Sequence, residues 1–172
     1  DGADVVIYNT CSVREHAEQK VWSRLGELRE IKASAPHMVI GVIGCMAERE
    51  GTDIFRRYPH LDILCGPGEL DKLPAMVQSA ALSNSNATSP TNTTARQVAL
   101  TGKNTRRSTT LQAAENGLET LDLSRSFSPA DGRTQAYVRI TRGCNKFCSY
   151  CIVPFTRGAE VHRPPQNIIE EV

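Results

Sequence analysis

The sequence is poor in aromatic residues and has no long hydrophobic run, and both absences limit the class of protein. Aromatic residues make up only 5% of the 172 residues, so large apolar anchors for a core are scarce. Because no run of about 18 apolar residues occurs, we expect no segment that spans a membrane. The first residues show no basic region followed by an apolar stretch, so we expect no signal peptide within them. The remaining composition, 40% hydrophobic and 23% charged, is ordinary for a soluble globular protein.

The net charge of +1 conceals an uneven distribution of charged residues along the chain. Residues 1–132 carry 14 basic and 16 acidic side chains, whereas residues 133–172 carry six basic and three acidic ones. A basic C-terminal segment can bind phosphate groups. A solvated face without any partner has the same excess of charge, so charge alone leaves both interpretations open.

The six cysteines are more informative than the charge. Three are clustered at positions 144, 148 and 151, and three are spread at positions 11, 45 and 65. A secreted domain stabilised by disulfides is usually shorter and richer in cysteine. Clustered cysteines in a chain with no visible secretory signal instead indicate metal or redox chemistry.

Alternating strand and helix patterns predict an α/β fold in the first 82 residues. Short apolar runs rich in β-branched residues indicate buried strands, and apolar residues at spacings of three and four indicate helices. Pro74 favours a last helix that begins only there. This order predicts a partial, Rossmann-like parallel sheet with right-handed crossovers. We expect strands at 4–8, 38–43 and 61–64, and helices at 14–32, 47–58 and 69–82.

A polar stretch interrupts this pattern. In residues 83–96, eleven of the fourteen residues are Ser, Thr, Asn or Pro. Such residues bury too little apolar surface to offset the entropy lost on ordering, so we predict a disordered linker at 83–130. An alternating strand pattern resumes at 135–141. It is followed by a predicted long loop at 142–165 and a helix from about Gln166.

The loop contains a dense cysteine motif, Cys144-Asn-Lys-Phe-Cys148-Ser-Tyr-Cys151. Thiolates are the usual protein ligands of iron–sulfur clusters. Three thiolates leave one iron of a 4Fe–4S cluster open to an external ligand, as a catalytic cluster requires. Zinc is the main alternative, because a fourth ligand such as His162 would complete a Cys₃His site. A purely structural cysteine cluster is a further alternative.

The spacing of the three cysteines, with Tyr150 just before the last, resembles the radical-SAM superfamily. In that superfamily the open iron chelates S-adenosylmethionine, and an electron from the cluster releases a 5′-deoxyadenosyl radical. The resemblance therefore implies a 4Fe–4S cluster on Cys144, Cys148 and Cys151, with S-adenosylmethionine bound there. It places Tyr150 near the adenine. Packing within the loop is the alternative role for Tyr150 and Phe147.

Longer segments resemble the methylthiotransferase family within that superfamily. Residues 142–158 and the Val-His-Arg-Pro segment at 161–164 look like its version of the cysteine loop. The Asn-Thr-Cys-Ser-Val-Arg-Glu-His-Ala-Glu-Gln-Lys segment at 9–20 and Gly-Val-Ile-Gly-Cys-Met at 41–46 are similar to its N-terminal domain. The segment at 9–20 is closest to the MiaB-like branch, which acts on N6-isopentenyladenosine next to the tRNA anticodon. The resemblance covers residues 1–78 and 134–172.

In this family three cysteines of the N-terminal domain hold a second 4Fe–4S cluster, the sulfur-delivery centre. Cys11 and Cys45 match the second and third of these. The first is expected before Asp1, so the resemblance implies a fragment. Physically, Cys11 and Cys45 each follow a predicted strand, and carboxyl ends of parallel strands share the sheet edge where such folds bind ligands. Cys65 also follows a predicted strand, but the family does not use that position and buried thiols are common.

The resemblance implies three segments and an enzyme. Residues 1–82 would be an incomplete methylthiotransferase N-terminal domain, 83–130 the linker, and 131–172 the first βα unit of a radical-SAM barrel. The implied reaction is methylthiolation of carbon 2 of N6-isopentenyladenosine in the tRNA anticodon loop. Methylthiolation of threonylcarbamoyl-adenosine, or an inactive truncated metal-binding protein, are the alternatives.

The implied partners follow from that reaction. They are tRNA, S-adenosylmethionine and an electron donor such as flavodoxin or ferredoxin. No association with a membrane is expected. The implied location is intracellular, either cytoplasmic or mitochondrial. Arg157 and Arg163 are candidates for contact with cofactor or tRNA phosphate, although either is equally explained as a surface charge.

Overall fold

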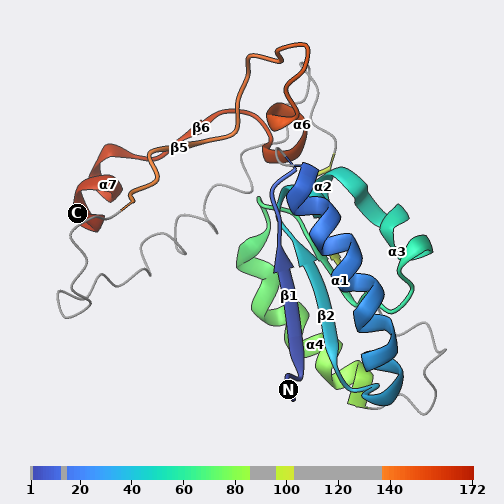
Figure 1. Cartoon of the computed structure of the whole chain (residues 1–172). Helices are drawn as coiled ribbons and strands as arrows, with labels where there is room; N and C mark the ends of the chain where they lie inside the picture. Colours follow the sequence, from blue (N-terminus) through green and yellow to red (C-terminus); the bar gives the residue numbers. More distant parts are fainter. Residues whose placement is uncertain (1, 13–14, 86–95, 103–136) are drawn as a thin grey trace. The chain divides into compact units, whose positions relative to one another are not determined.

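The computed structural model describes residues 2–12, 15–85, 96–102 and 137–172 (Figure 1). The chain divides into two compact units, Asp1–Gly102 (unit 1) and Lys103–Val172 (unit 2). The boundary between them falls inside the range predicted to be a linker. Among the helices in the described ranges, none combines the length and the apolar character needed to cross a lipid bilayer.

Unit 1 alternates strands and helices, as the sequence pattern predicts. Its four strands pair in parallel, in the order β1-β2-β3-β4. The α/β class and the parallel sheet are therefore confirmed. The elements are β1 (Val5–Asn9), α1 (Glu15–Ser34), β2 (Val39–Ile43), α2 (Cys45–Glu50), α3 (Ile54–Arg57), β3 (Ile63–Cys65), α4 (Leu73–Ser85) and β4 (Gln97–Ala99), with 3₁₀ turns at Gly51–Asp53 and Leu70–Lys72.

The sheet of unit 1 has one core on each face, because successive strand residues point to opposite sides. Helices α1 and α3 cover one face, and α4 covers the other (Figure 1). The first core includes Val21, Leu25, Leu28, Ile40, Val42, Met46 and Leu64. The second includes Val39, Ile43, Ile63, Cys65, Met76 and Ala80. Burial on both faces explains why β2 and β3 are continuous apolar runs rather than alternating ones.

Helix boundaries in unit 1 follow glycine and proline. The helix predicted at 47–58 is in fact two short helices separated by a 3₁₀ turn, because Gly51 adopts a φ of 61° and ends α2. Helix α4 begins at Leu73, beside Pro74, as the proline predicts. The turn before it, Leu70–Lys72, is 3₁₀ rather than α-helical.

The prediction of a disordered linker at 83–130 is wrong at strand β4. Residues 97–99, placed in that linker, pair in parallel with β3 from Ile63 to Cys65. The Gln97 N–H also donates to the Asp62 carbonyl at 2.8 Å. A three-residue strand with half-exposed side chains has too little apolar character to be seen in the sequence, and backbone pairing with β3 stabilises it. The remaining linker residues, apart from 83–85 in α4 and 96–102, lie outside the described ranges.

In its described residues, 137–172, unit 2 has an antiparallel pair of very short strands and two helices. Its elements are β5 (Thr141–Arg142), α6 (Val153–Arg157), β6 (Val161–His162) and α7 (Pro165–Glu171). The strand predicted at 135–141 is thus shorter and later. The predicted loop at 142–165 contains α6 and β6. Pro154 lies in the first turn of α6, where a proline is tolerated. The helix predicted from Gln166 is confirmed as α7.

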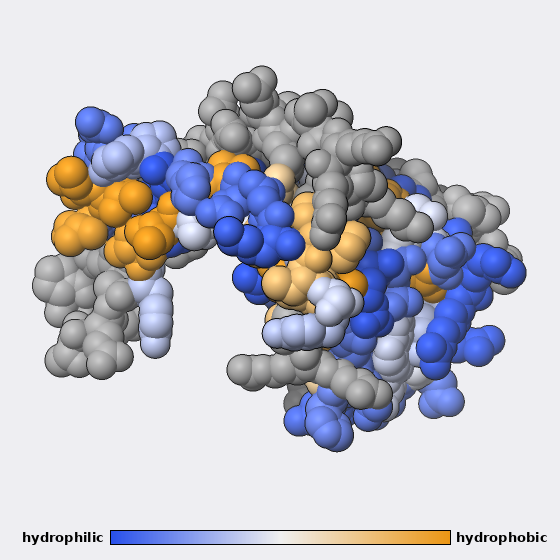
Figure 2. All heavy atoms as spheres, turned by 90° about the horizontal axis from the view of Figure 1, so that it is seen from above, coloured by the Kyte–Doolittle hydropathy of each residue, from blue (hydrophilic) through white to orange (hydrophobic). Residues whose placement is uncertain are grey.

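Unit 2 exposes much of its apolar surface. Tyr137, Ile140, Ile169 and Val172 are all exposed, and Figure 2 shows apolar surface gathered around α7. Few of its described residues are buried, among them Pro154, Thr156 and Arg163. Its described segments are held by hydrogen bonds and ion pairs rather than by an apolar core like those of unit 1.

Candidate functional site

Cys11 and Cys45 occupy equivalent positions at the carboxyl edge of the unit 1 sheet. The last residues of β1 and β2, Asn9 and Ile43, are paired in register, and each cysteine lies two residues beyond its strand's member of that pair. The backbone continues the pairing, because Thr10 N–H donates to Ile43 O at 3.2 Å and Met46 N–H donates to Thr10 O at 3.3 Å. The predicted convergence of these two segments at one edge is therefore present. Cys11 is half-buried and Cys45 is buried.

Gly44 allows the two segments to approach so closely. Its φ is 89°, a left-handed conformation that disfavours any residue with a Cβ. A Cβ at this position would lie 2.7 Å from Asn9 Oδ1 and 3.0 Å from Thr10 O. The glycine before Cys45 therefore fixes the direction in which α2 leaves the sheet edge. Sequence reasoning missed this role, although a glycine between a strand and a cysteine is a visible signal.

Cys65 differs from these two cysteines in depth. It is the last residue of β3 and pairs with Ile43, so it lies inside the sheet rather than beyond its edge. Its side chain is 0% exposed, and its Sγ donates to the Glu69 carbonyl at 3.3 Å. Burial raises the pKa of the Cys65 thiol to about 11, which keeps it protonated at neutral pH. The strand ends one residue later than predicted, and the position is that of a core thiol.

Buried polar atoms lie on the segments that adjoin Cys11 and Cys45. Glu18 of α1 is buried, and its Oε2 accepts from Arg49 Nη2 of α2 at 2.7 Å. Glu18 Oε1 and Ser12 Oγ are buried without a hydrogen-bond partner in the structure. Each unsatisfied buried polar atom costs about 1–3 kcal/mol. The segments beside the two thiols thus carry polar atoms that the chain itself leaves unsatisfied, which suits a site that receives a polar or charged group.

Glu48 ties the end of unit 1 to the same helix that carries Cys45. Its carboxylate accepts the N–H groups of Gly102 at 2.6 Å and Thr101 at 3.1 Å. Burial raises the pKa of Glu48, and these two donors act in the opposite direction. One carboxylate oxygen occupies the place that a Cβ of residue 66 would need, so a side chain there would displace the end of Glu48. Neither residue was identified from the sequence.

The cysteine loop of unit 2 is closed at its base by hydrogen bonds. Cys144 N–H donates to the Gly158 carbonyl at 3.1 Å, and Glu160 N–H donates to Asn145 Oδ1 at 3.0 Å. Gly143 has a φ of 71°, and the Ala159 carbonyl occupies the space of a Cβ there. Gly143 therefore resembles Gly44 of unit 1: each is a left-handed glycine that directly precedes a cysteine and lies against the backbone of a neighbouring segment.

Within the loop, the three cysteines lie around a tight turn. Cys151 N–H donates to the Cys148 carbonyl at 3.1 Å. Phe147 has a φ of 46°, a conformation that is uncommon outside glycine and often marks a functional segment. Its ring packs edge-to-face on Phe155, with centroids 5.5 Å apart, so the loop-packing role is present for Phe147. Tyr150 is 92% exposed and has no such role.

The donor chemistry of this loop fits an iron–sulfur cluster, because thiolates are the usual protein ligands of such clusters. Cys144 and Cys151 are half-buried and Cys148 is exposed, and all three are thiols outside any disulfide. Across the described residues, no three His, Cys, Asp or Glu side chains are close enough together to hold a metal ion. His162 is exposed, and its Nε2 lies 3.3 Å from Oε1 of Glu160. The predicted ligand sets therefore share a loop or a sheet edge without forming a preorganised metal site.

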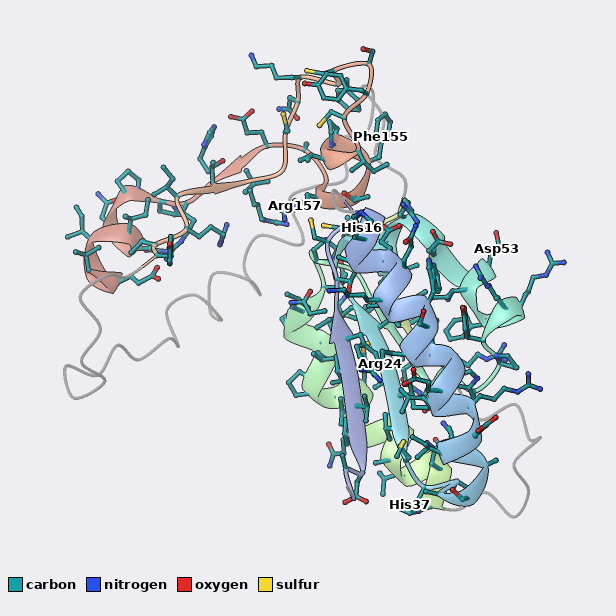
Figure 3. All side chains as sticks on the ribbon, viewed as in Figure 1. His16, Arg24, His37, Asp53, Phe155 and Arg157 are labelled. Carbon is teal, nitrogen blue, oxygen red and sulfur yellow. The ribbon has the colours of Figure 1, made fainter. Side chains whose placement is uncertain are left out.

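The two arginines proposed for phosphate contact differ sharply in exposure. Arg163 is buried, forms an ion pair with Glu171 and donates to the Arg139 carbonyl at 2.7 Å. It therefore ties β6 and α7 together. Arg157 ends α6 and is exposed (Figure 3). Of the two, only Arg157 is accessible to a cofactor or a phosphate group.

Comparison with known proteins identifies relatives along the whole chain. A family model described as "Uncharacterized protein family UPF0004" matches residues 1–66. The tRNA-2-methylthio-N(6)-dimethylallyladenosine synthase of Rhodopirellula baltica is 42% identical over 170 residues, which cover 98% of this chain and 33% of that protein. Synthases of the same name from Polynucleobacter asymbioticus and Legionella pneumophila are 40% and 39% identical, over 100% and 99% of this chain and 33% of their own length.

The extent of this similarity decides the family. The chain spans about a third of the length of the relatives that it matches. The similarity extends over 98% or more of the chain, and so includes the sheet edge with Cys11 and Cys45 as well as the loop with Cys144, Cys148 and Cys151. The chain belongs to the methylthiotransferase family of the tRNA-2-methylthio-N(6)-dimethylallyladenosine synthases.

Proposed function

We propose that this chain serves the methylthiolation of carbon 2 of N6-isopentenyladenosine next to the anticodon of tRNA. The observation that carries the proposal is the register of Cys11 and Cys45, which stand side by side at one sheet edge while a separate loop carries three more cysteines. Two separate groups of thiols suit a reaction that needs both a radical source and a sulfur donor. Carbon 2 of adenosine carries an unactivated hydrogen, so acid–base catalysis alone does not remove it.

In this proposal Cys144, Cys148 and Cys151 hold a 4Fe–4S cluster. The cluster, with bound S-adenosylmethionine, would supply the radical chemistry that removes the hydrogen at carbon 2. The chain's own residues fix the base of the loop: Gly143 admits the Ala159 carbonyl, and Cys144 N–H donates to Gly158. The exposed ring of Tyr150 is free to lie on an adenine.

Cys11 and Cys45 would hold the second 4Fe–4S cluster, which serves sulfur delivery. Their two thiolates need at least one further ligand, which the described residues do not supply. The ion pair between buried Glu18 and exposed Arg49 holds α2 against α1 and so positions Cys45. The depth and raised pKa of Cys65 argue for its exclusion from the ligand set.

The proposed partners are tRNA, S-adenosylmethionine and an electron donor such as flavodoxin or ferredoxin, in an intracellular setting. The basic excess of residues 133–172 suits contact with phosphate. The segment at 9–20 favours the isopentenyl substrate over the threonylcarbamoyl one. The name of the relatives, which specifies N(6)-dimethylallyladenosine, supports the same choice.

The test uses the gene that encodes this chain, in the cell, because the chain spans about a third of its relatives. Deleting the gene is expected to remove 2-methylthio-N6-isopentenyladenosine from tRNA and to let the unthiolated nucleoside accumulate. Cys11→Ala and Cys148→Ala are expected to do the same. Cys65→Ala is the matched control and should leave the modification in place. Mass spectrometry of digested tRNA, organellar tRNA included, measures all four strains.

The other outcomes separate the alternatives. If the isopentenyl product persists and only the threonylcarbamoyl product disappears, the substrate assignment is wrong. If neither product changes, the protein is an inactive metal-binding relative. Loss of the product in the Cys65→Ala strain, with normal protein abundance, would place Cys65 in the ligand set instead.

A further inference from the structure

A groove lies between α1 and the chain from the end of α3 to His60, in unit 1. Its volume is about 420 Å³, within the range of small-ligand sites. Residue Gly26 lies eleven positions after the start of α1, which is roughly 16 Å along a helix. The groove is therefore separate from the sheet edge that carries Cys11 and Cys45, which is called the cysteine edge below. It is lined by Gly26, Arg29, Glu30, Ala33, Arg57, Tyr58 and His60.

Hydrogen bonds hold the two walls of the groove together. Tyr58 Oη donates to the Trp22 carbonyl at 3.3 Å, and His60 Nε2 lies 2.7 Å from the Leu25 carbonyl. A carbonyl only accepts, so Nε2 of His60 carries the proton and the ring orientation is fixed. Burial lowers the pKa of His60, which favours the neutral ring. The groove is therefore largely preformed, and His60 contributes shape rather than charge.

Arg57 is held in place by aromatic rings. Trp22 and Tyr58 are stacked, with centroids 5.3 Å apart and ring planes 9° from parallel. The guanidinium carbon of Arg57 lies 5.2 Å from the Trp22 centroid and 5.3 Å from the Tyr58 centroid. Such cation–π contacts orient the guanidinium while the residue stays exposed. An oriented guanidinium loses little conformational entropy when it binds an anion.

Among the described residues, the two arginines of the groove also have no acidic partner in an ion pair. Elsewhere in unit 1, Arg24 pairs with Glu27, Arg49 with Glu18 and Glu50, Lys32 with Asp62, and Lys72 with Glu69. No carboxylate within the described ranges forms an ion pair with Arg29 or Arg57. Against these two charges the groove lining contains one carboxylate, Glu30. The groove thus carries positive charge that the described part of unit 1 does not neutralise.

We propose that this groove binds a phosphate of an RNA strand, through Arg29 and Arg57. Guanidinium groups bind phosphate through two parallel hydrogen bonds, and a guanidinium plane can also stack on an unpaired base. The choice of a phosphate follows from the unpaired arginines. The choice of RNA as its source rests on the proposed function. A contact remote from the cysteine edge would position the tRNA rather than take part in the chemistry.

The experiment measures binding of a fluorescein-labelled anticodon stem–loop RNA to the whole 172-residue chain, by anisotropy at several KCl concentrations. Arg29→Gln and Arg57→Gln are each expected to weaken binding several-fold and to lower the slope of log affinity against log salt by about 0.7–0.9. Arg24→Gln, on the same helix but paired with Glu27, is the matched control and should leave both quantities unchanged. Arg57→Lys should fall between wild type and Arg57→Gln, because it keeps the charge and loses the planar fork.

Three results would overturn the proposal. They are absence of RNA binding by the wild-type chain, unchanged salt slopes in both variants, and displacement of the RNA by AMP at an equal nucleotide concentration. The last would show that the groove takes a free nucleotide. Arg29, unlike Arg57, makes no cation–π contact with a ring of the described residues, so Arg29→Gln remains informative if Arg57→Gln alters the fold. Cys148→Ala is expected to bind RNA like wild type, which separates failure of this proposal from failure of the proposed chemistry.

Discussion

The two units place their cysteines by different physical means. In unit 1, Cys11 and Cys45 continue the register of two strands that lie between cores on both faces, so the fold itself fixes the backbone at these thiols. In unit 2, a loop closed by a two-residue strand pair carries Cys144, Cys148 and Cys151. A loop without an apolar core gains more from a bound metal than a sheet edge does, because metal binding then supplies folding free energy. Metal loading and stability should therefore respond differently in the two units.

The largest expected effect concerns iron. Anaerobic reconstitution should give the chain about four irons on the loop, as a single 4Fe–4S cluster requires. Replacing Cys144, Cys148 and Cys151 together by Ala should remove that iron, which metal analysis and visible absorption measure. Cys65→Ala is the control and should retain it. Stoichiometric zinc with no iron uptake, in protein purified without oxygen, would contradict the assignment of a 4Fe–4S cluster to this loop.

The next effect concerns thiol reactivity. At pH 8 without metal, iodoacetamide should modify exposed Cys148 more than about a hundredfold faster than Cys65, because Cys65 is buried and only about one thiol in a thousand ionises when the pKa is about 11. The raised pKa also means that the folded chain loses stability as the pH rises from 9.0 toward about 11. Peptide mapping by mass spectrometry measures the rates. Equal rates would show that β3 opens readily.

A third effect compares apolar truncations. Leu25→Ala should destabilise unit 1 by about 2–5 kcal/mol, because this side chain is 0% exposed in the core between α1 and the sheet. Ile169→Ala, at 75% exposure on α7, should change stability by less than about 0.5 kcal/mol. Urea unfolding followed by circular dichroism measures both. A large effect of Ile169→Ala would reveal a core in unit 2 that the described residues do not show.

The smallest effect concerns two glycines of unit 1. Gly44→Ala should cost about 1–3 kcal/mol, because φ is 89° and the added Cβ would lie 2.7 Å from Asn9 Oδ1. Gly26→Ala should instead stabilise by about 0.5–1 kcal/mol, because Gly26 lies within α1 and an added Cβ meets nothing within 4 Å. Thermal unfolding compares the two. Opposite signs are expected, and a neutral Gly44→Ala would show that the sheet edge adapts.

Much of unit 1 could be predicted from the sequence, because buried strands and amphipathic helices leave clear apolar patterns. The apolar runs before Asn9 and around Ile43 predicted the two strands and therefore the edge where Cys11 and Cys45 lie. Strand β4 escaped prediction, because its residues have no apolar run and depend on pairing with β3. Cys65 is buried, in agreement with the expectation of a core thiol, but it lies within β3 rather than after it. Its depth depends on a strand that ends one residue later than the sequence pattern suggests.

In unit 2 the sequence predicted the cysteine motif better than the structure around it. The loop contains α6 and β6, which are too short to leave a periodic signal. The left-handed Phe147 and the buried Arg163–Glu171 ion pair depend on backbone and side-chain packing that residue spacing does not encode. The candidate ligands could be identified from the sequence, whereas the local geometry that supports these cysteines could not.

The carboxylate of Glu48 has a consequence for the divergence of this chain over evolutionary time. Its oxygen occupies the space beside residue 66, so any side chain at 66 requires Glu48 to shorten or turn away. Turning away would release Thr101 and Gly102, which both donate to that carboxylate. Positions 48 and 66 are therefore expected to change together: lineages that lose the glycine should also lose the glutamate, with both states surviving and few intermediates between them.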